Sequence, residues 1–179
     1  MIWKWDKDGA TKVLFPDEKC ECYFSMSFPE KVIPKADGHF LLHKLQMEIV
    51  TLPLTDFLQK DFSHANSEAI LRHHLAYELD YLKKVVGKDR LTLTKDKWQR
   101  DTSTLLWQIK RHSKAGTSIL VSTSVVKDDC VVYLSSIVPD EATGDLISQS
   151  MLEIIKSLKS HRPSSKKEAE RLIDDYAGG

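Results

Sequence analysis

The sequence has no excess of charge of either sign, and that absence argues against two classes of ligand. It contains 26 Lys and Arg residues and 26 Asp and Glu residues, so its formal net charge is zero. A protein that grips nucleic acid by its phosphates needs a basic excess or a basic stripe. Attraction to an anionic membrane surface needs clusters of Lys and Arg. We therefore expect the chain to bind neither nucleic acid nor anionic lipid.

Long apolar runs are also missing. No stretch of the sequence approaches the ~20 apolar residues that cross a membrane as a helix. Residues 1–8, which include Trp3 and Trp5, contain no apolar core of a signal peptide. These absences predict a cytoplasmic protein with no membrane span. A chain from which an export signal had been removed would show the same pattern.

Cysteine is scarce. The three cysteines are Cys20, Cys22 and Cys130, so one of them stays unpaired in any disulfide scheme. Reduced thiols in a cytosol are the simpler interpretation. The Cys20-Glu-Cys22 sequence suggests a redox or metal pair, but no second Cys or His pair follows it at zinc spacing. We expect both side chains to pack in the core, where a free cysteine behaves as a small hydrophobe.

Motifs for nucleotide binding and covalent catalysis are absent. The sequence has no G-x-G-x-x-G or P-loop motif, and no serine lies in a G-x-S-x-G context. His39 and His43 would lie roughly 13 Å apart on one strand. The adjacent His73 and His74 would point about 100° apart on a helix, so neither pair can chelate one metal. The sequence therefore predicts a protein that is not an enzyme and has no cofactor.

What the sequence does contain is a run of strand patterns in the second half of the chain. Leu105, Trp107 and Ile109 alternate with polar residues, as in a strand with one buried face. Residues 117–126 are rich in β-branched side chains, and residues 130–138 are apolar on both faces, as in a central strand. The connections are short, so the three strands should form an antiparallel meander.

A helix should follow, after a break at residues 139–144. Its apolar side chains recur at the helical period: Ile147, Met151, Ile154, Ile155 and Leu158. Such a stripe must be buried, and the meander offers the nearest apolar surface.

The first half of the chain predicts two strands and one helix. The strands span residues 20–28 and 39–52, and each is ended by a proline. The helix spans residues 68–86, with Asn66 or Ser67 as its N-cap.

The remaining segments complete an α+β fold. Residues 1–14 suggest an edge strand or an ordered arm, 91–94 a short strand, and 95–102 a polar connection. We expect one domain over residues 1–160, with an antiparallel β-sheet packed against helices. A C-terminal linker and short helix should occupy residues 161–179, because a capping-box pattern starts there.

Four segments together resemble the Mog/PsbP-like superfamily, which includes bacterial DcrB-like domains of unknown function. They are Phe24-Ser-Met-Ser-Phe-Pro29, Leu106-Trp-Gln-Ile109, Val131-Val-Tyr-Leu-Ser-Ser-Ile-Val-Pro139 and Met151-Leu-Glu-Ile-Ile-Lys-Ser-Leu-Lys159. The resemblance implies an α/β/α sandwich and a role without catalysis. Members of the superfamily bind the small GTPase Ran, support photosystem II or act as chaperones for secreted effectors. Their binding motifs do not map onto this sequence, so the resemblance implies no site residues.

The candidate site residues come from the predicted elements. His73 and Tyr77 share the outer side of the first helix, and Trp98 lies among charged residues. Aromatic side chains are enriched at binding hot spots, although an ordinary exposed helix face would look the same. Ser122 and Ser124 alternate with buried residues and suit a concave sheet face.

These residues predict a partner rather than a substrate. We expect another protein as the partner, with the chain acting as an adaptor or chaperone. The alternative is a carrier or minor enzyme that holds a small apolar ligand on the sheet face. A homodimer through the last short helix or an exposed sheet edge is the third hypothesis.

Overall fold

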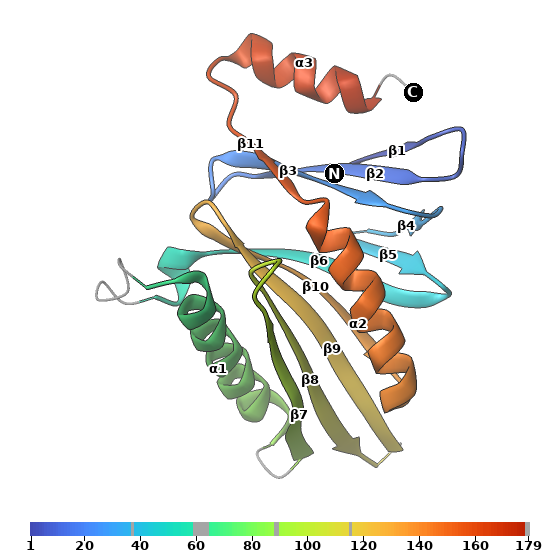
Figure 1. The fold of residues 1–179 in the computed structure, drawn as a ribbon, viewed down its shortest axis with the longest axis vertical. Helices are drawn as coiled ribbons and strands as arrows, with labels where there is room; N and C mark the ends of the chain where they lie inside the picture. Colours follow the sequence, from blue (N-terminus) through green and yellow to red (C-terminus); the bar gives the residue numbers. More distant parts are fainter. Residues whose placement is uncertain (37, 59–64, 88–89, 115, 178–179) are drawn as a thin grey trace.

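A computed structural model describes residues 1–36, 38–58, 65–87, 90–114 and 116–177. They form two antiparallel sheets flanked by helices (Figure 1). The small sheet contains, in spatial order, β1 (Ile2–Trp5), β2 (Thr11–Asp17), β3 (Cys22–Phe28) and β11 (Lys159–His161). The large sheet contains, in spatial order, β4 (Ile33–Pro34), β5 (His39–Leu42), β6 (Leu45–Pro53), β10 (Cys130–Val138), β9 (Gly116–Lys127), β8 (Thr104–Ser113) and β7 (Leu91–Gln99). The helices are η1 (Leu54–Asp56, a 3-10 turn), α1 (Ser67–Val86), α2 (Glu141–Lys156) and α3 (Lys166–Ala177).

The predicted meander is confirmed as β8, β9 and β10. β10 lies between β6 and β9 and is covered on both faces, as its two apolar faces indicated. Val132 and Leu134 belong to the core that contains α2, while Val131 belongs to the core that contains α1. Because adjacent strand residues point to opposite faces, α1 and α2 pack on opposite sides of the large sheet (Figure 1). The expected α/β/α sandwich is therefore confirmed.

The small sheet packs beside α2 and shares its core. Phe24, Met26 and Phe28 of β3 are buried in the same cluster as Met151 of α2. The other side of the small sheet is covered by α3, which contacts β1 and β2 (Figure 1). The Lys4 ammonium group donates to the carbonyl of Asp175 at 2.9 Å. The predicted C-terminal helix is thus present and lies against the first strands of the chain.

The strand expected over residues 39–52 is wrong, because the chain reverses in the middle of it. His43 and Lys44 have φ angles of 51° and 65° and connect β5 to β6. Positive φ at both central residues is the geometry of a type I′ hairpin turn, for which the usual residues are Asn and Gly. Without those residues the turn left no signal in the sequence. His39 therefore lies on a strand and His43 in a turn.

The polar connection expected at residues 95–102 is also corrected. β7 continues through Lys95, Asp96 and Lys97 to Gln99, with an irregular register between Leu93 and Lys95. This strand forms an edge of the large sheet. Charged residues are common on edge strands because they discourage pairing with other chains. The same charges interrupt the alternation of apolar and polar residues, so the sequence pattern did not indicate a strand here.

α2 begins earlier than the break at residues 139–144 suggested. Asp140 caps the helix by accepting a hydrogen bond from the Thr143 backbone N–H at 2.8 Å. Gly144 lies inside the helix rather than before it. A Cβ atom there would lie 3.3 Å from the Cγ2 atom of Val121, so the glycine allows the helix to approach the sheet closely.

The linker expected from residue 161 is partly strand. β11 pairs with β3, and the Oγ atom of Ser25 lies 2.8 Å from Nε2 of His161. The strand crosses the boundary that the sequence suggested between residues 160 and 161. The sequence also predicts an irregular stretch or short helical turn at residues 55–65 and a frayed end at 178–179. Most of the first segment and all of the second lie outside the described residues.

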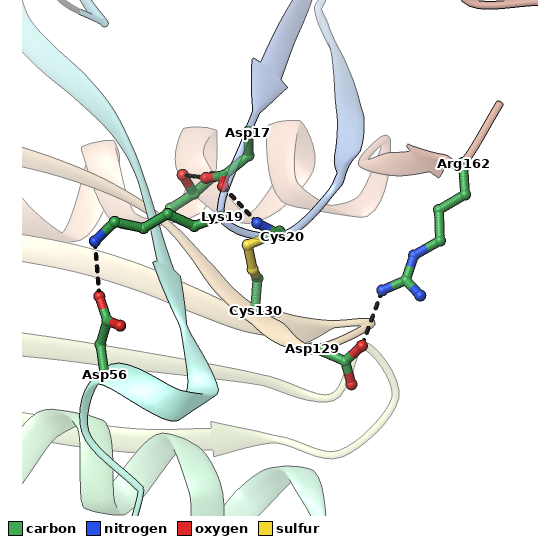
Figure 2. The surroundings of a disulfide bond; sticks show 8 residues. Asp17, Lys19, Cys20, Asp56, Asp129, Cys130 and Arg162 are labelled. Carbon is green, nitrogen blue, oxygen red and sulfur yellow. Dashed lines mark hydrogen bonds and ion pairs between the residues drawn. A yellow bond between two sulfur atoms is a disulfide. The ribbon is translucent and has the colours of Figure 1, made fainter. Parts of the chain in front are cut away.

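The expectation of reduced cysteines is wrong in this structure. Cys20 and Cys130 are joined by a disulfide, with their Cα atoms 6.3 Å apart (Figure 2). Cys20 precedes β3 rather than lying on it, and only Cys22 is a free, buried thiol. The bridge ties the β2–β3 connection of the small sheet to the start of β10 in the large sheet. A pairing across 110 positions could not be read from spacing alone.

Polar contacts surround the disulfide (Figure 2). The backbone N–H of Cys20 donates to Asp17 at 2.8 Å, and Thr51 of β6 donates to the other oxygen of the same carboxylate. Lys19 pairs with Asp56 at 3.0 Å, and Arg162 pairs with Asp129 at 2.9 Å. The two sheets are therefore held together at this end by ionic contacts as well as by the covalent bond.

Candidate functional site

The structure brings two of the predicted site residues together. The Nε2 atom of His73 lies 3.2 Å from the carbonyl oxygen of Phe57, and the two rings stack with centroids 6.1 Å apart. The Tyr77 ring lies 6.0 Å from the same Phe57 ring and is 44% exposed. His73 is thus partly engaged in packing, whereas Tyr77 is available to a partner.

Trp98 lies elsewhere. It is on β7 and packs against the core under α1. The flank of α1 that meets β7 carries Arg72, which pairs with Asp96 at 2.7 Å. Arg72 and Tyr77 are five positions apart, or roughly 140° around a helix. Trp98 and Tyr77 therefore belong to different flanks of α1 and not to one surface.

Ser122 and Ser124 are interior residues, which corrects the expectation that they line an open sheet face. Both have no exposed area. The hydroxyl of Ser122 donates to the carbonyl of Leu134 at 3.0 Å, and that of Ser124 accepts from Nε1 of Trp107 at 3.3 Å. α1 covers this side of β9, and Trp107 lies opposite Ser122 in the sheet. The face is filled by side chains.

A hollow surface does exist on the α1 side of the large sheet, next to the helix. A cavity of about 280 Å³ is lined by Glu48 and Ser135 together with Leu120 and Ile137. A second cavity of about 60 Å³ shares Leu120 and Ile137 and extends to Leu82, near the end of α1. Ile137 is 59% exposed. The two cavities are therefore neighbours, and both include Ile137 of β10 in their lining.

Leu82 and Val86 of α1 line the smaller cavity, and a second stripe of the helix lies next to them. Residues at positions i, i+4, i+7 and i+11 share a helix face, and here they are His74, Glu78, Tyr81 and Val85. The His74 ring lies 5.0 Å from the ring of Tyr133 on β10. Tyr81 and Val85 are 57% and 63% exposed. We call the two cavities together the α1–β10 groove, lined by Glu48, Leu120, Ser135 and Ile137 on the sheet and by Leu82 and Val86 on α1. Tyr81 and Val85 directly precede Leu82 and Val86 in the helix.

Tyr133 on β10 is influenced by two acidic side chains. Burial raises the pKa of the Tyr133 hydroxyl well above its ordinary value, and the carboxylates of Glu78 and Glu48 raise it further. One carboxylate comes from α1 and the other from β6, and Tyr133 itself is half-buried.

The ion pairs of these carboxylates within the described residues are made to histidines. Glu48 lies 3.4 Å from Nε2 of His39, and Glu78 lies 3.6 Å from Nε2 of His74. An imidazole carries a positive charge only when it is protonated. No Lys or Arg of the described chain forms a salt bridge with either carboxylate.

His74 is buried with unmet hydrogen-bonding capacity. It has no exposed area, and neither ring nitrogen has a hydrogen-bond partner among the described residues. Its ring contacts Phe57 edge to face at 5.6 Å. A buried polar atom without a hydrogen bond costs free energy, and the one ion pair of this ring among the described residues is with the Glu78 carboxylate, at 3.6 Å.

The polar groups of the groove do not reproduce the arrangement of a serine hydrolase. The Ser135 hydroxyl donates to one oxygen of Glu48, and His39 lies near the other oxygen. In a hydrolase triad the imidazole contacts the hydroxyl and the carboxylate contacts the imidazole. Here the carboxylate lies between the other two groups, so His39 is not placed to accept the proton of Ser135.

No helix in the described residues has the length and apolarity needed to cross a membrane. No cluster of three or more His, Cys, Asp or Glu side chains in them is arranged to hold a metal ion.

Comparison with known proteins shows similarity in structure but not in sequence. No known protein family and no curated protein matches the sequence. The cyanobacterial PsbP protein (CyanoP) of Synechocystis has a solution structure with a TM-score of 0.53 at 10% identity, covering 87% of this chain and 95% of that one. At this identity the likeness shows the fold alone, and the expected Mog/PsbP-like fold is confirmed.

Two further structures are more distant. The Ran-binding protein Mog1p of Saccharomyces cerevisiae has a TM-score of 0.46 at 12% identity, covering 84% of this chain and 89% of that one. A protein of unknown function from Pseudomonas aeruginosa has a TM-score of 0.42 at 8% identity, covering 79% and 94%. Neither supports an argument about function. The finer resemblance to bacterial DcrB-like domains stays a prediction.

Proposed function

We propose that this chain, which has the Mog/PsbP-like fold, is a non-catalytic domain that binds another protein through the α1–β10 groove. The observation that carries the proposal is the exposure of Ile137 in the groove and of Tyr81 and Val85 on α1, at the positions next to the groove residues Leu82 and Val86. Exposed apolar groups that line a depression and are rimmed by polar residues are typical of interaction sites. An adaptor or chaperone would use such a surface.

The absence of catalysis is part of the same proposal. Ser135 is the groove residue most similar to a nucleophile, and its hydroxyl is already bonded to Glu48. The alternative of a carrier or minor enzyme needs an open sheet face for an apolar ligand. That alternative receives less support, because Leu105, Trp107 and Ile109 fill the face beneath α1.

The location of the protein is a second proposal. The cytoplasm was expected from the sequence, but the Cys20–Cys130 disulfide favours a compartment that maintains disulfides. An experiment can distinguish the cytoplasm from an oxidising compartment. Free thiols are blocked during cell lysis, and the blocked cysteines are then counted by mass spectrometry. One blocked cysteine, Cys22, would support an oxidising compartment, and three would favour the cytoplasm.

Site-specific photo-crosslinking tests the binding function. A photoreactive phenylalanine analogue at Tyr81 should give a discrete adduct with another protein in cells. The same analogue at Leu146, which is 64% exposed on α2, serves as the matched control because α2 covers the opposite face of the large sheet. An adduct made by both positions equally, or by neither, would contradict the proposal. An adduct at Tyr81 that contains only this chain would favour the homodimer.

A further inference from the structure

We infer that the smaller cavity of the α1–β10 groove binds a leucine-like side chain of the partner, and that Arg111 at its edge pairs with an acidic side chain of the same partner segment. This inference rests on the proposed function and specifies the sequence that the groove recognises. It starts from the lining of the cavity, which is largely apolar and in which Arg111 is the only charged residue among those described.

An apolar row of side chains forms the sheet side of the cavity. In the sheet register, Leu120 of β9 is paired with Ile109 of β8 and with Ile137 of β10. Ile109 is fully buried, whereas Ile137 is 59% exposed, so the row runs from the core to the surface. Leu82 and Val86 of α1 supply the helical side of the lining. An aliphatic side chain that enters the cavity therefore meets apolar groups from both the sheet and the helix.

Arg111 lies in the next row of the sheet. It is two positions from Ile109 on β8, so both side chains point to the same face, roughly 7 Å apart. The register pairs Arg111 with Leu91 of β7 and with Ser118 of β9, and neither neighbour carries a charge. The side chain of Arg111 is exposed, and within the described residues its guanidinium group forms no salt bridge or hydrogen bond. A carboxylate from a partner would complement this unpaired charge.

The size of the cavity favours a single side chain over a small-molecule ligand. Its volume is about 60 Å³, well below the roughly 300–1,000 Å³ of pockets that enclose drug-sized molecules. In an extended partner segment, residues two apart project to one side at a spacing of roughly 7 Å, which matches the spacing of Ile109 and Arg111. The partner segment should therefore contain a leucine and, two positions away, an aspartate or glutamate.

Methyl NMR of the intact protein tests the inference, because the methyl groups of the lining report directly on the cavity. The probe is the blocked peptide acetyl-Ser-Leu-Ser-Glu-Ser-amide, in which glutamate carries the only charge. We expect it to shift the methyl signals of Leu82, Leu120 and Ile137. The dissociation constant should be on the order of 1 mM, because one small side chain and one exposed ion pair contribute little affinity. Unshifted methyl signals at about ten times that peptide concentration would overturn the inference.

Two altered peptides separate the apolar contact from the ionic one. Alanine in place of leucine should weaken binding about tenfold, because it removes most of the apolar area that is buried. Glutamine in place of glutamate should weaken binding about threefold, and this difference should disappear at high salt. Equal binding of all three peptides would contradict the inference. So would tighter binding of 4-methylpentanoate, which joins a leucine-like chain to a carboxylate, because a small acid rather than a protein segment would then be the ligand.

The variant Arg111→Gln tests the assigned cation. It should bind the glutamate peptide as weakly as the wild-type protein binds the glutamine peptide, and it should no longer distinguish the two. The matched control is Lys114→Gln, which removes an exposed cation from the turn between β8 and β9 that does not line the cavity. Its affinity should equal that of the wild type. Circular dichroism melting checks that both variants are folded. A folded Arg111→Gln protein that still prefers the glutamate peptide would refute the assignment.

The Tyr81 cross-link distinguishes a failure of this inference from a failure of the proposed function. If the adduct with another protein keeps its full yield in the Arg111→Gln background, the protein-binding function stands and this inference fails. If the wild-type protein forms no such adduct in cells but binds the glutamate peptide through Arg111, the recognition site stands and the protein-binding function fails. A yield that falls in Arg111→Gln and not in Lys114→Gln would support both.

Discussion

Cys20 and Cys130 join the two sheets by a covalent bond whose ends are 110 positions apart in the chain. Both cysteines are almost fully buried. Cross-linking distant residues restricts the unfolded chain, so the bond should stabilise the folded state.

Replacing both bridged cysteines should lower the free energy of unfolding. Because the closed loop is long, we expect Cys20→Ala/Cys130→Ala to lose about 2–5 kcal/mol, measured by chemical denaturation under oxidising conditions. The reducing agent dithiothreitol should destabilise the wild-type protein and leave the double variant unchanged. Equal stability of the two proteins would show that the bond does not form.

Replacing the free thiol provides the control. Cys22 is buried and lies outside the disulfide, so Cys22→Ala should retain the sensitivity to dithiothreitol. A loss of that sensitivity would mean that Cys22, rather than Cys20, is the residue that pairs with Cys130.

The helix cap at Asp140 should make stability depend on pH in the acid range. Backbone and side-chain hydrogen bonds from Thr143 lower the pKa of the Asp140 carboxyl. The folded state therefore favours the ionised carboxylate. The stabilisation that this carboxylate provides is present above the unfolded pKa and is lost as pH falls through the folded pKa. Asp140→Asn keeps an acceptor but cannot ionise. The difference in melting temperature between the wild type and this variant should shrink below about pH 4, and a constant difference would contradict the assignment.

His74 should be replaceable by an apolar residue. Its ring nitrogens are buried without hydrogen-bond partners among the described residues, and its ion pair with Glu78 is long, at 3.6 Å. His74→Met therefore removes buried polar atoms that make no hydrogen bond and keeps most of the volume. We expect a melting temperature equal to or above that of the wild type. A loss of more than about 2 kcal/mol would show that the imidazole makes a hydrogen bond. His73→Met is the comparison, and it should destabilise because Nε2 of His73 lies 3.2 Å from the Phe57 carbonyl oxygen.

Ile137 should matter to binding and not to stability. Its side chain is 59% exposed in the α1–β10 groove, and substitutions at such positions usually change stability by less than about 0.5 kcal/mol. Ile137→Ser should therefore have the same melting temperature as the wild type, and it should reduce the yield of the Tyr81 cross-link. Leu146→Ser, at a similarly exposed position on α2, should leave the yield unchanged. A similar loss of yield in both variants would place the contact outside the groove.

The sequence predicted the architecture because the apolar side chains within most elements recur at a single period, that of a helix or that of a strand. The alternation of Leu105, Trp107 and Ile109 and the stripe of α2 survive in the structure, since both are set by burial. The sequence failed where a backbone conformation or a charge overrode the pattern. His43 and Lys44 adopt positive φ without being glycine, and β7 is charged because it lies at an edge.

The candidate site was less predictable than the fold. Tyr77 was identified because the helical period of the apolar residues places its aromatic ring on the opposite, exposed face of the helix. Glu48, Glu78 and Tyr133 were not, because they come from three elements that no local sequence pattern links. The i, i+4 spacing of His74 and Glu78 was the one local signal available. Ser122 and Ser124 were misassigned because their hydroxyls satisfy partners inside the sheet.

The pairing of β11 with β3 has a consequence for how the protein is made. Ser25 and His161 meet across 136 positions, so a ribosome adding 5–20 residues per second needs on the order of ten seconds to deliver the last neighbour of β3. Until then the nascent chain carries an uncapped strand edge, the kind of surface that recruits other polypeptides. A frameshift or stop codon that removes β11 would leave that edge open permanently, and the truncated product should aggregate even though the large sheet is complete.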